Sequence, residues 1–139
     1  MKLYKYYILV FLFIGFSNAY AQVAIIANKS VPEGSISTDK LSQIYLLKAN
    51  KWSNGAAIIP ITLKSENETS KKFFNVIGKS SMEMKKIWMK IQLTGEGQSP
   101  AGFGSEEEIL EKVASTPGAI GFISLDKVND KVKVLLEIK

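Results

Sequence analysis

The sequence has 139 residues, of which 18 are basic and 13 are acidic, so the formal net charge is +5 at pH 7. It contains no cysteine and no histidine, and every basic residue is a lysine. These absences exclude disulfides, thiolate catalysis, Cys/His zinc sites and a Ser-His-Asp triad. The lysines do not alternate with aromatic residues in one patch, so we expect no nucleic-acid partner. We also expect no metal site and no cofactor.

Residues 1–21 have the organisation of a cleavable signal peptide. Two lysines precede an apolar run over residues 6–16, and the segment ends in an Ala-x-Ala cleavage pattern at residues 19–21. The apolar run is too short to span a bilayer, and no cysteine is available for lipid attachment. We therefore expect residues 22–139 to be a single domain, periplasmic or secreted, without a membrane anchor.

Four apolar runs have the composition of strands. The runs at residues 23–27, 57–63 and 119–123 are nearly continuous, which is typical of strands buried on both faces of an α/β sheet. The run at residues 132–136 alternates its faces. Pro60, inside the second run, indicates an edge strand or a bulge.

Helical signals lie between these runs. Leu41, Ile44 and Tyr45 recur at the spacing of an amphipathic helix, which Ser37 can cap. Three Ser-x-x-Glu capping boxes predict the starts of three further helices, at Ser65, Ser80 and Ser105. The glycine-rich segment 95–104 is expected to be a loop. The resulting order, β-α-β-α-α-α-β-β, predicts one α/β domain.

Two Ser-x-x-Lys sequences, Ser37–Lys40 and Ser124–Lys127, match the acylating motif of penicillin-binding enzymes. Such enzymes also need Ser-Asp-Asn and Lys-Thr-Gly partners, which the sequence lacks. Ser37 already serves as a helix cap, and histidine, the usual general acid–base residue, is absent. We therefore expect no catalytic residues and no enzymatic activity.

The segment after the second strand is the candidate binding site. A helix N-terminus with free N–H groups, adjacent hydroxyls and lysines can bind an oxyanion. The candidate oxyanion-binding residues are Lys64, Ser65, Asn67, Thr69 and Ser70. Alternatively, Ser65 and Glu68 only cap each other and the lysines are solvated, because capping boxes are common. Trp52 and Trp88 are expected to be packing residues.

Two stretches resemble the phosphate-binding subunits of phosphate ABC transporters. Residues 41–61 are similar to the family pattern L-x-x-I-F-x-G-x-x-x-x-W-x-x-G…I-x-P-V, and residues 113–122 to V-x-x-T-P-G-A-I-G-Y-V. Together the matches span about residues 23–125, nearly all of the expected mature chain, and the sequence resembles in particular short, secreted single-domain relatives that correspond to the second lobe. The resemblance implies a single lobe of a type II periplasmic binding protein, with a mostly parallel central sheet flanked by helices.

The binding turn departs from the family pattern. Leu63 stands at the family's arginine position, and Glu68 puts a carboxylate where the anion's oxygens would lie. The resemblance thus implies a secreted, non-enzymatic protein that binds inorganic phosphate or a similar oxyanion weakly or only with a partner, such as a membrane transporter or sensor. The alternative is a periplasmic protein-interaction module that has lost ligand binding and docks through its former ligand face or through segment 95–104.

We predict cleavage between Ala21 and Gln22, because the apolar run is short and is followed by a good cleavage pattern. Mass spectrometry of the exported protein checks this prediction. An exported chain that still begins with Met1 would contradict it.

Overall fold

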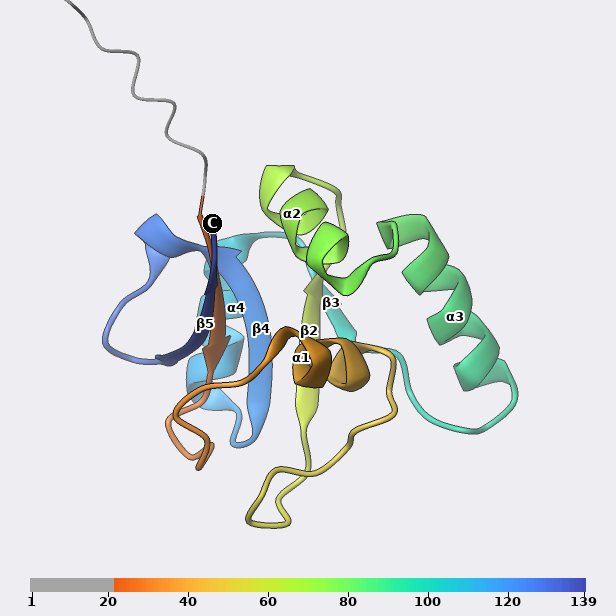
Figure 1. The fold of residues 1–139 in the computed structure, drawn as a ribbon, viewed down its shortest axis with the longest axis horizontal. Coiled ribbons are helices and arrows are strands. Elements are labelled where there is room, and N and C mark those ends of the chain that lie inside the picture. The colour runs from red at the N-terminus through yellow and green to blue at the C-terminus, as the bar shows by residue number, and fades with distance from the viewer. Residues whose placement is uncertain (1–21) are drawn as a thin grey trace, which may run out of the picture.

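The computed structural model describes residues 22–139, and the expected signal peptide at residues 1–21 lies outside the described residues. Figure 1 shows the helices and strands of the domain. In chain order they are β1 (Val23–Ala27), α1 (Thr38–Tyr45), β2 (Ile59–Leu63), α2 (Glu68–Ile77), α3 (Ser81–Leu93), β3 (Ala101–Phe103), α4 (Glu106–Ser115), β4 (Ala119–Ser124), the 3-10 helix η1 (Leu125–Lys127) and β5 (Lys133–Ile138). The expected α/β class is confirmed, but β3 was missed because it is only three residues long and lies in a glycine-rich segment.

The five strands form one sheet in the order β3-β2-β4-β1-β5. β2 pairs in parallel with β3 and β4, whereas β1 pairs antiparallel with both β4 and β5. The sheet is therefore mixed, and the expectation of a mostly parallel sheet overstates its parallel part. The apolar run of β1 could not reveal this, because a central strand covered on both faces has the same composition whichever way it runs.

Helices cover both faces of the sheet, as expected. On one face, Phe122 of β4 stacks on Phe73 of α2, with ring centroids 4.0 Å apart, and Tyr45 of α1 packs edge-on against Phe73. On the other face α4 lies directly against Gly121, where an added Cβ would come within 2.9 Å of the Ile109 side chain. The core thus lies in two layers, one on each side of β4.

The tryptophans belong to this core, as expected. Trp88 of α3 is 4% exposed, and its indole N–H donates a hydrogen bond of 2.7 Å to the Tyr45 carbonyl. Trp52 is buried, and its indole N–H donates to the carbonyl of Gly118, 2.9 Å away. Gly118 has a φ of +79°, which explains why the Thr-Pro-Gly turn needs glycine there.

Pro60 does not mark an edge strand, because β2 lies between β3 and β4. The pairing of β2 with β3 begins only at Ile61, and the N–H of Ile59 donates to Gly118 on the β4 side. Since successive residues of a strand direct their N–H groups to opposite sides, position 60 faces the side on which β3 has not yet begun. The missing N–H of proline therefore costs no ladder hydrogen bond.

Serine caps begin three of the four α-helices. The backbone N–H groups of Lys40, Glu83 and Glu108 donate to the hydroxyls of Ser37, Ser80 and Ser105. The expected cap at Ser65 is wrong: α2 begins at Glu68 with Asn67 as its N-cap, and Asn67 and Ser70 form the capping box. Ser65 is exposed. Ser65 and Asn67 are both good N-cap residues, and the spacing of the neighbouring residues does not show which of them begins the helix.

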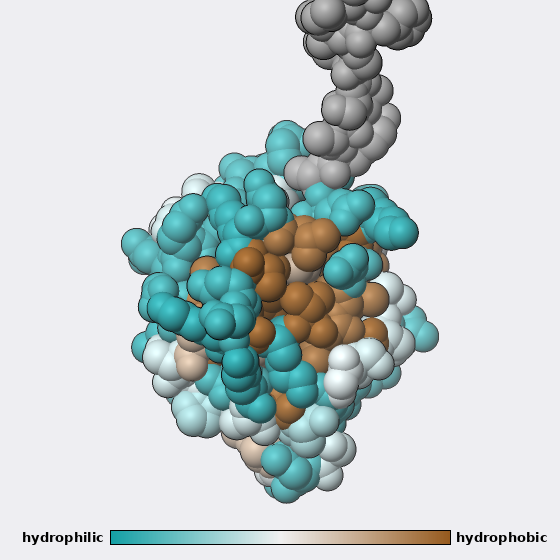
Figure 2. Space-filling model, turned by 90° about the vertical axis from the view of Figure 1, so that its left-hand side faces the viewer, coloured by the Kyte–Doolittle hydropathy of each residue, from teal (hydrophilic) through white to brown (hydrophobic). Residues whose placement is uncertain are grey.

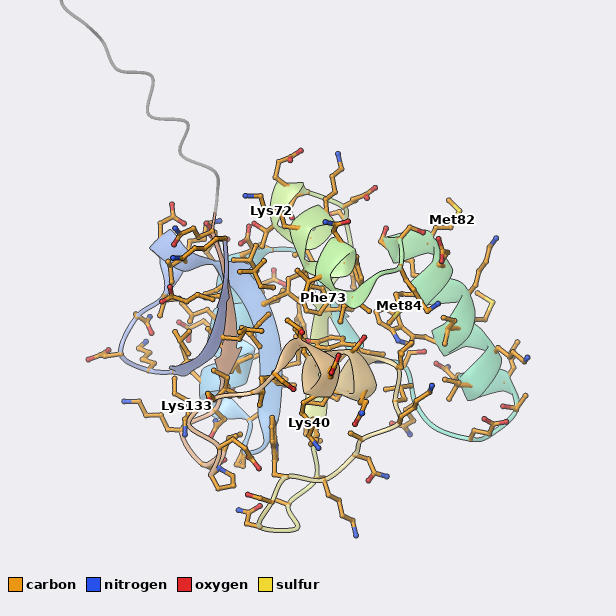
Figure 3. The ribbon with its side chains drawn as sticks, in the orientation of Figure 1. Lys40, Lys72, Phe73, Met82, Met84 and Lys133 are labelled. Atoms are coloured by element: carbon orange, nitrogen blue, oxygen red, sulfur yellow. The ribbon has the colours of Figure 1, made fainter. Side chains whose placement is uncertain are left out.

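α3 lies at the margin of the domain, beside α2 and the β3 end of the sheet (Figure 1). Figure 3 shows Met84 pointing from α3 toward the rest of the domain and Met82 pointing away from it. Met82, Met89 and Leu93 of α3 are 67%, 62% and 80% exposed. No helix within residues 22–139 is long and apolar enough to cross a membrane.

We predict that replacing Trp88 by Ala lowers the free energy of unfolding by about 3–5 kcal/mol, because the change leaves a large core cavity and removes the hydrogen bond to Tyr45. Denaturant unfolding measures the loss. A loss below about 1 kcal/mol would place Trp88 outside the core.

We predict that Asn67→Ala lowers the free energy of unfolding by about 1–2 kcal/mol, because α2 loses its N-cap. Ser65→Ala is the matched control, and its effect should stay within about 0.5 kcal/mol. Equal losses in the two variants would contradict the assignment of the cap.

Candidate functional site

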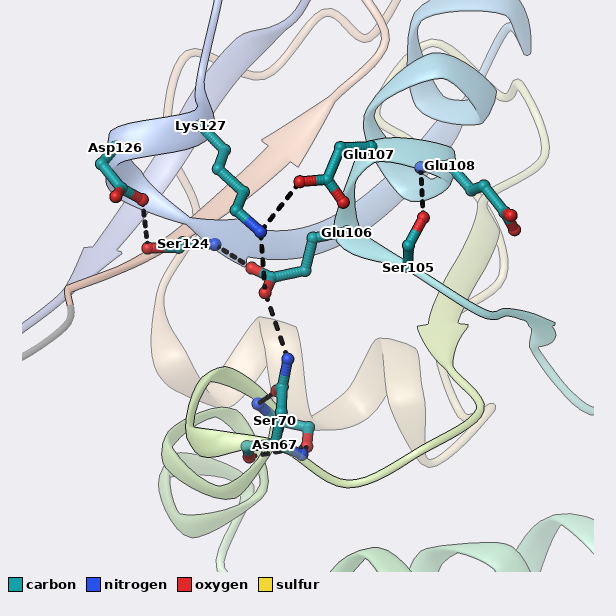
Figure 4. Close-up of polar contacts among 9 residues, drawn as sticks. All are labelled: Asn67, Ser70, Ser105, Glu106, Glu107, Glu108, Ser124, Asp126 and Lys127. Carbon is teal, nitrogen blue, oxygen red and sulfur yellow. Dashed lines mark hydrogen bonds and ion pairs between the residues drawn. The ribbon is translucent and has the colours of Figure 1, made fainter.

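The candidate site lies at the edge of the sheet where the parallel strands β2, β3 and β4 end. β2 leads into the N-terminus of α2, β3 into the N-terminus of α4, and β4 into η1. Because the strands are parallel, these three connections emerge at the same edge. Figure 4 shows the polar side chains that meet there.

The N-terminus of α2 carries three of the predicted oxyanion-binding residues. The Asn67 side-chain oxygen accepts from the Ser70 N–H at 2.9 Å, and the Ser70 hydroxyl accepts from the Asn67 N–H at 2.8 Å. Thr69 and Ser70 are buried. Asn67 and Ser70 therefore cap the helix together, and the Ser65–Glu68 box of the alternative interpretation does not form.

The other two predicted residues lie apart from this cap. Lys64 and Ser65 are exposed. The Lys64 side chain lies across Gly102 of β3, since an added Cβ on that glycine would meet Lys64 Cγ at 2.9 Å. The Lys64 side chain thus packs on β3.

A residue missed by the sequence analysis lies at the centre of the site. Glu106, the first residue of α4, is only 7% exposed. One oxygen of its carboxylate accepts from the Ser124 N–H at 2.5 Å, and the other accepts from the Asn67 side-chain amide at 3.1 Å. Lys127 of η1 lies 3.5 Å from the same carboxylate. One carboxylate thus joins all three connections (Figure 4).

The groups around Glu106 are those that an oxyanion site would offer. A backbone N–H at the end of a strand, a side-chain amide at a helix N-terminus and an ammonium group are all suited to a bound anion. In this chain the carboxylate of Glu106 takes their hydrogen bonds and charge. In the sequence, Glu106 is an acidic residue in the first turn of a helix. Acidic residues are common there because they interact favourably with the helix dipole, so this position does not identify Glu106 as a site residue.

Lys127 is held as a cation by two carboxylates. It lies 3.0 Å from Glu107, and this hydrogen bond raises the pKa of the Lys127 amino group and lowers the pKa of the Glu107 carboxyl. The charge of Glu106 raises the pKa of Lys127 further. Lys127 therefore remains an ammonium group at neutral pH.

The Ser-x-x-Lys sequences do not form acylating pairs in this geometry. The hydroxyl of Ser124 donates to Asp126, and Lys127 is engaged by its two carboxylates instead of acting as a neutral base. The hydroxyl of Ser37 accepts from the backbone N–H of Lys40, as a helix cap does. Within residues 22–139, no group of three or more acidic, histidine or cysteine side chains is placed to hold a metal ion.

Glu68 does not occupy the place of an anion. Its side chain is 80% exposed and lies 3.6 Å from Lys71 on the outside of α2. Leu63, at the position that the resemblance assigns to an arginine, is 5% exposed in the core. Of the two glutamates, only Glu106 is buried among the polar groups at this edge of the sheet.

Several solved structures share this fold. An ABC-type phosphate transport receptor from Vibrio cholerae has a TM-score of 0.64 at 18% identity, over 84% of this chain and 46% of its own. A structure assigned to a phosphate ABC transporter substrate-binding protein from Clostridium perfringens, with bound phosphate, has a TM-score of 0.68 at 20% identity, over 84% and 45%. PstS from Borrelia burgdorferi has a TM-score of 0.59 at 21% identity, over 83% and 47%.

This chain thus spans less than half the length of the proteins that it matches, as expected of a single lobe. The resemblance to phosphate ABC transporter substrate-binding proteins is confirmed. A family model described as the PBP superfamily domain matches residues 14–136, which is most of the sequence. The chain therefore belongs to the family described as the PBP superfamily domain.

Proposed function

We propose that this protein is a secreted, non-enzymatic oxyanion-binding-like domain whose anion site is occupied by its own Glu106 carboxylate. The observation that carries the proposal is the set of contacts of this buried carboxylate with Ser124, Asn67 and Lys127. Phosphate is the candidate ligand because structural relatives are described as phosphate transport proteins, one of them with bound phosphate. Binding should be weak or should depend on a partner.

Weak phosphate binding is expected because the Glu106 carboxylate repels an anion and already accepts the hydrogen bonds of the nearby donors. A phosphate placed beside the Glu106 carboxylate, at about 4 Å and an effective dielectric constant of about 20, meets a repulsion of about 4 kcal/mol, or roughly a thousandfold in affinity. If Glu106 moves away instead, the domain loses the hydrogen bonds that join its three connections. Either route disfavours binding, so we expect a dissociation constant in the millimolar range or weaker.

Export belongs to the same proposal. We propose that residues 1–21 are removed and that residues 22–139 act in the periplasm or outside the cell, as a component that meets a membrane transporter or sensor. A domain about half the length of its structural relatives provides only one side of a two-lobed site. A partner that supplies the remaining contacts would allow tighter binding than this chain reaches alone.

We predict that Glu106→Gln and Glu106→Ala increase phosphate affinity at least about tenfold, because 1.4 kcal/mol of relieved repulsion is enough for that gain. Isothermal titration calorimetry at low salt measures it. Both variants should unfold more easily than the wild type, by about 1–3 kcal/mol, because the donors on Ser124 and Asn67 lose their charged acceptor.

Glu107→Gln is the matched control for this prediction. It removes the same charge from the adjacent residue, whose exposed side chain contacts Lys127 but neither Ser124 nor Asn67. Its phosphate affinity should remain near that of the wild type. In addition, phosphate should raise the melting temperature of Glu106→Ala by occupying the released donors. Folded Glu106 variants with no gain in affinity would overturn the proposal.

A protein-interaction module is the second candidate function, and one surface favours it. β5 is an edge strand, and Figure 2 shows a large group of apolar side chains on the side of the molecule where β5 lies. Val134 and Leu136 of β5 are partly exposed. An apolar surface beside an unpaired strand edge is typical of a contact with another protein. This candidate becomes the leading one if the Glu106 variants gain no affinity.

A further inference from the structure

A groove separates α3 from the β2–β3 part of the sheet, away from the Glu106 carboxylate. Its volume is about 420 Å³, within the range of small-molecule sites. Trp88, Met89 and Leu93 line it from α3, and Pro100 and Gly102 line it from β3 and the segment before it. The wall is therefore largely apolar.

One buried polar group in this groove lacks a partner. Thr62 of β2 lines the groove and is 5% exposed, and within residues 22–139 its hydroxyl has no hydrogen-bond partner. A buried hydroxyl without a partner costs free energy, because it has lost water and gained nothing. The hydroxyl is closed off from the solvent in the groove, so a ligand that accepts its hydrogen bond and removes this cost must displace neighbouring side chains.

The charges of the groove are segregated along its length. Lys64 and Lys85 both line the groove near the end of β2, where the Lys85 ammonium donates to the backbone carbonyl of Lys64 at 3.3 Å. Farther along α3, Gln92 accepts a hydrogen bond from Ser99 at 2.8 Å, and Leu93 lies in the last turn of the helix. The residues that line the groove include two lysines and no acidic side chain. One end is thus cationic, and the other is uncharged, with Leu93 beside the Gln92–Ser99 hydrogen bond.

We propose that this groove binds a small amphipathic carboxylate, such as a medium-chain fatty acid. The carboxylate pairs with the Lys64 and Lys85 side chains and reaches the Thr62 hydroxyl once neighbouring side chains move aside, and the hydrocarbon chain lies along Trp88, Met89 and Leu93. Charge complementarity selects an anion, and the apolar wall selects a single hydrocarbon chain over inorganic phosphate. The site is separate from the Glu106 carboxylate and does not depend on the proposed function.

The test compares three ligands that share one hydrocarbon chain: decanoate and decyltrimethylammonium, each below its micelle concentration, and decanol, below its solubility limit. Calorimetry gives the affinity, and the indole N–H signal of Trp88 in the nitrogen–proton NMR spectrum reports occupation of the groove. Decanoate should bind at least about tenfold more tightly than the other two, because only decanoate pairs with the lysines. Equal binding of all three would overturn the proposal and indicate a merely apolar surface.

Two variants and two controls complete the test. Lys85→Gln and Thr62→Val should each weaken decanoate binding about fivefold or more, and Thr62→Val should also raise the melting temperature, because it removes the unpartnered hydroxyl. Lys86→Gln removes the same charge from an exposed position of α3 outside the groove and should not change decanoate affinity.

Glu106→Ala should also leave decanoate affinity unchanged, which keeps this test distinct from that of the phosphate site. Unchanged decanoate binding in both Lys85→Gln and Thr62→Val would overturn the proposal. So would a chemical-shift change confined to residues outside the groove.

Discussion

A single buried carboxylate connects the three segments that leave the carboxyl edge of the sheet. Glu106 begins α4, and it accepts hydrogen bonds from the end of β4 and from the N-cap of α2. Its charge is balanced by Lys127, which also holds Glu107. Because a buried carboxylate is tolerated only with such partners, these contacts tie α2, α4 and η1 together at this edge.

Much of the fold could be predicted from local patterns. The apolar runs at β1, β2 and β4, and the caps at Ser37, Ser80 and Ser105, depend on neighbouring residues and were correctly located. The direction of β1 could not be predicted, because both of its neighbours, β4 and β5, come from the end of the chain. β3 has only three residues, too few for a period of two to be recognised.

The candidate oxyanion-binding residues follow β2, at the edge of the sheet where the parallel strands end, but their side chains do not stay together. Asn67 and Ser70 lie there, engaged in the N-cap of α2, whereas the Lys64 side chain extends toward the groove beside α3. Glu106 was missed because its partners Asn67 and Ser124 are 39 and 18 residues away in the sequence. A contact of that kind leaves no local pattern, and a glutamate in the first turn of a helix has an ordinary explanation.

A crystal structure of the wild-type protein grown in concentrated phosphate tests the central claim, the occupation of the anion site by Glu106, most directly. We expect the Glu106 carboxylate to keep its hydrogen bonds to the Ser124 N–H and the Asn67 amide, with no phosphate between them. A phosphate bound to those two donors, with the Glu106 side chain turned toward solvent, would contradict the claim.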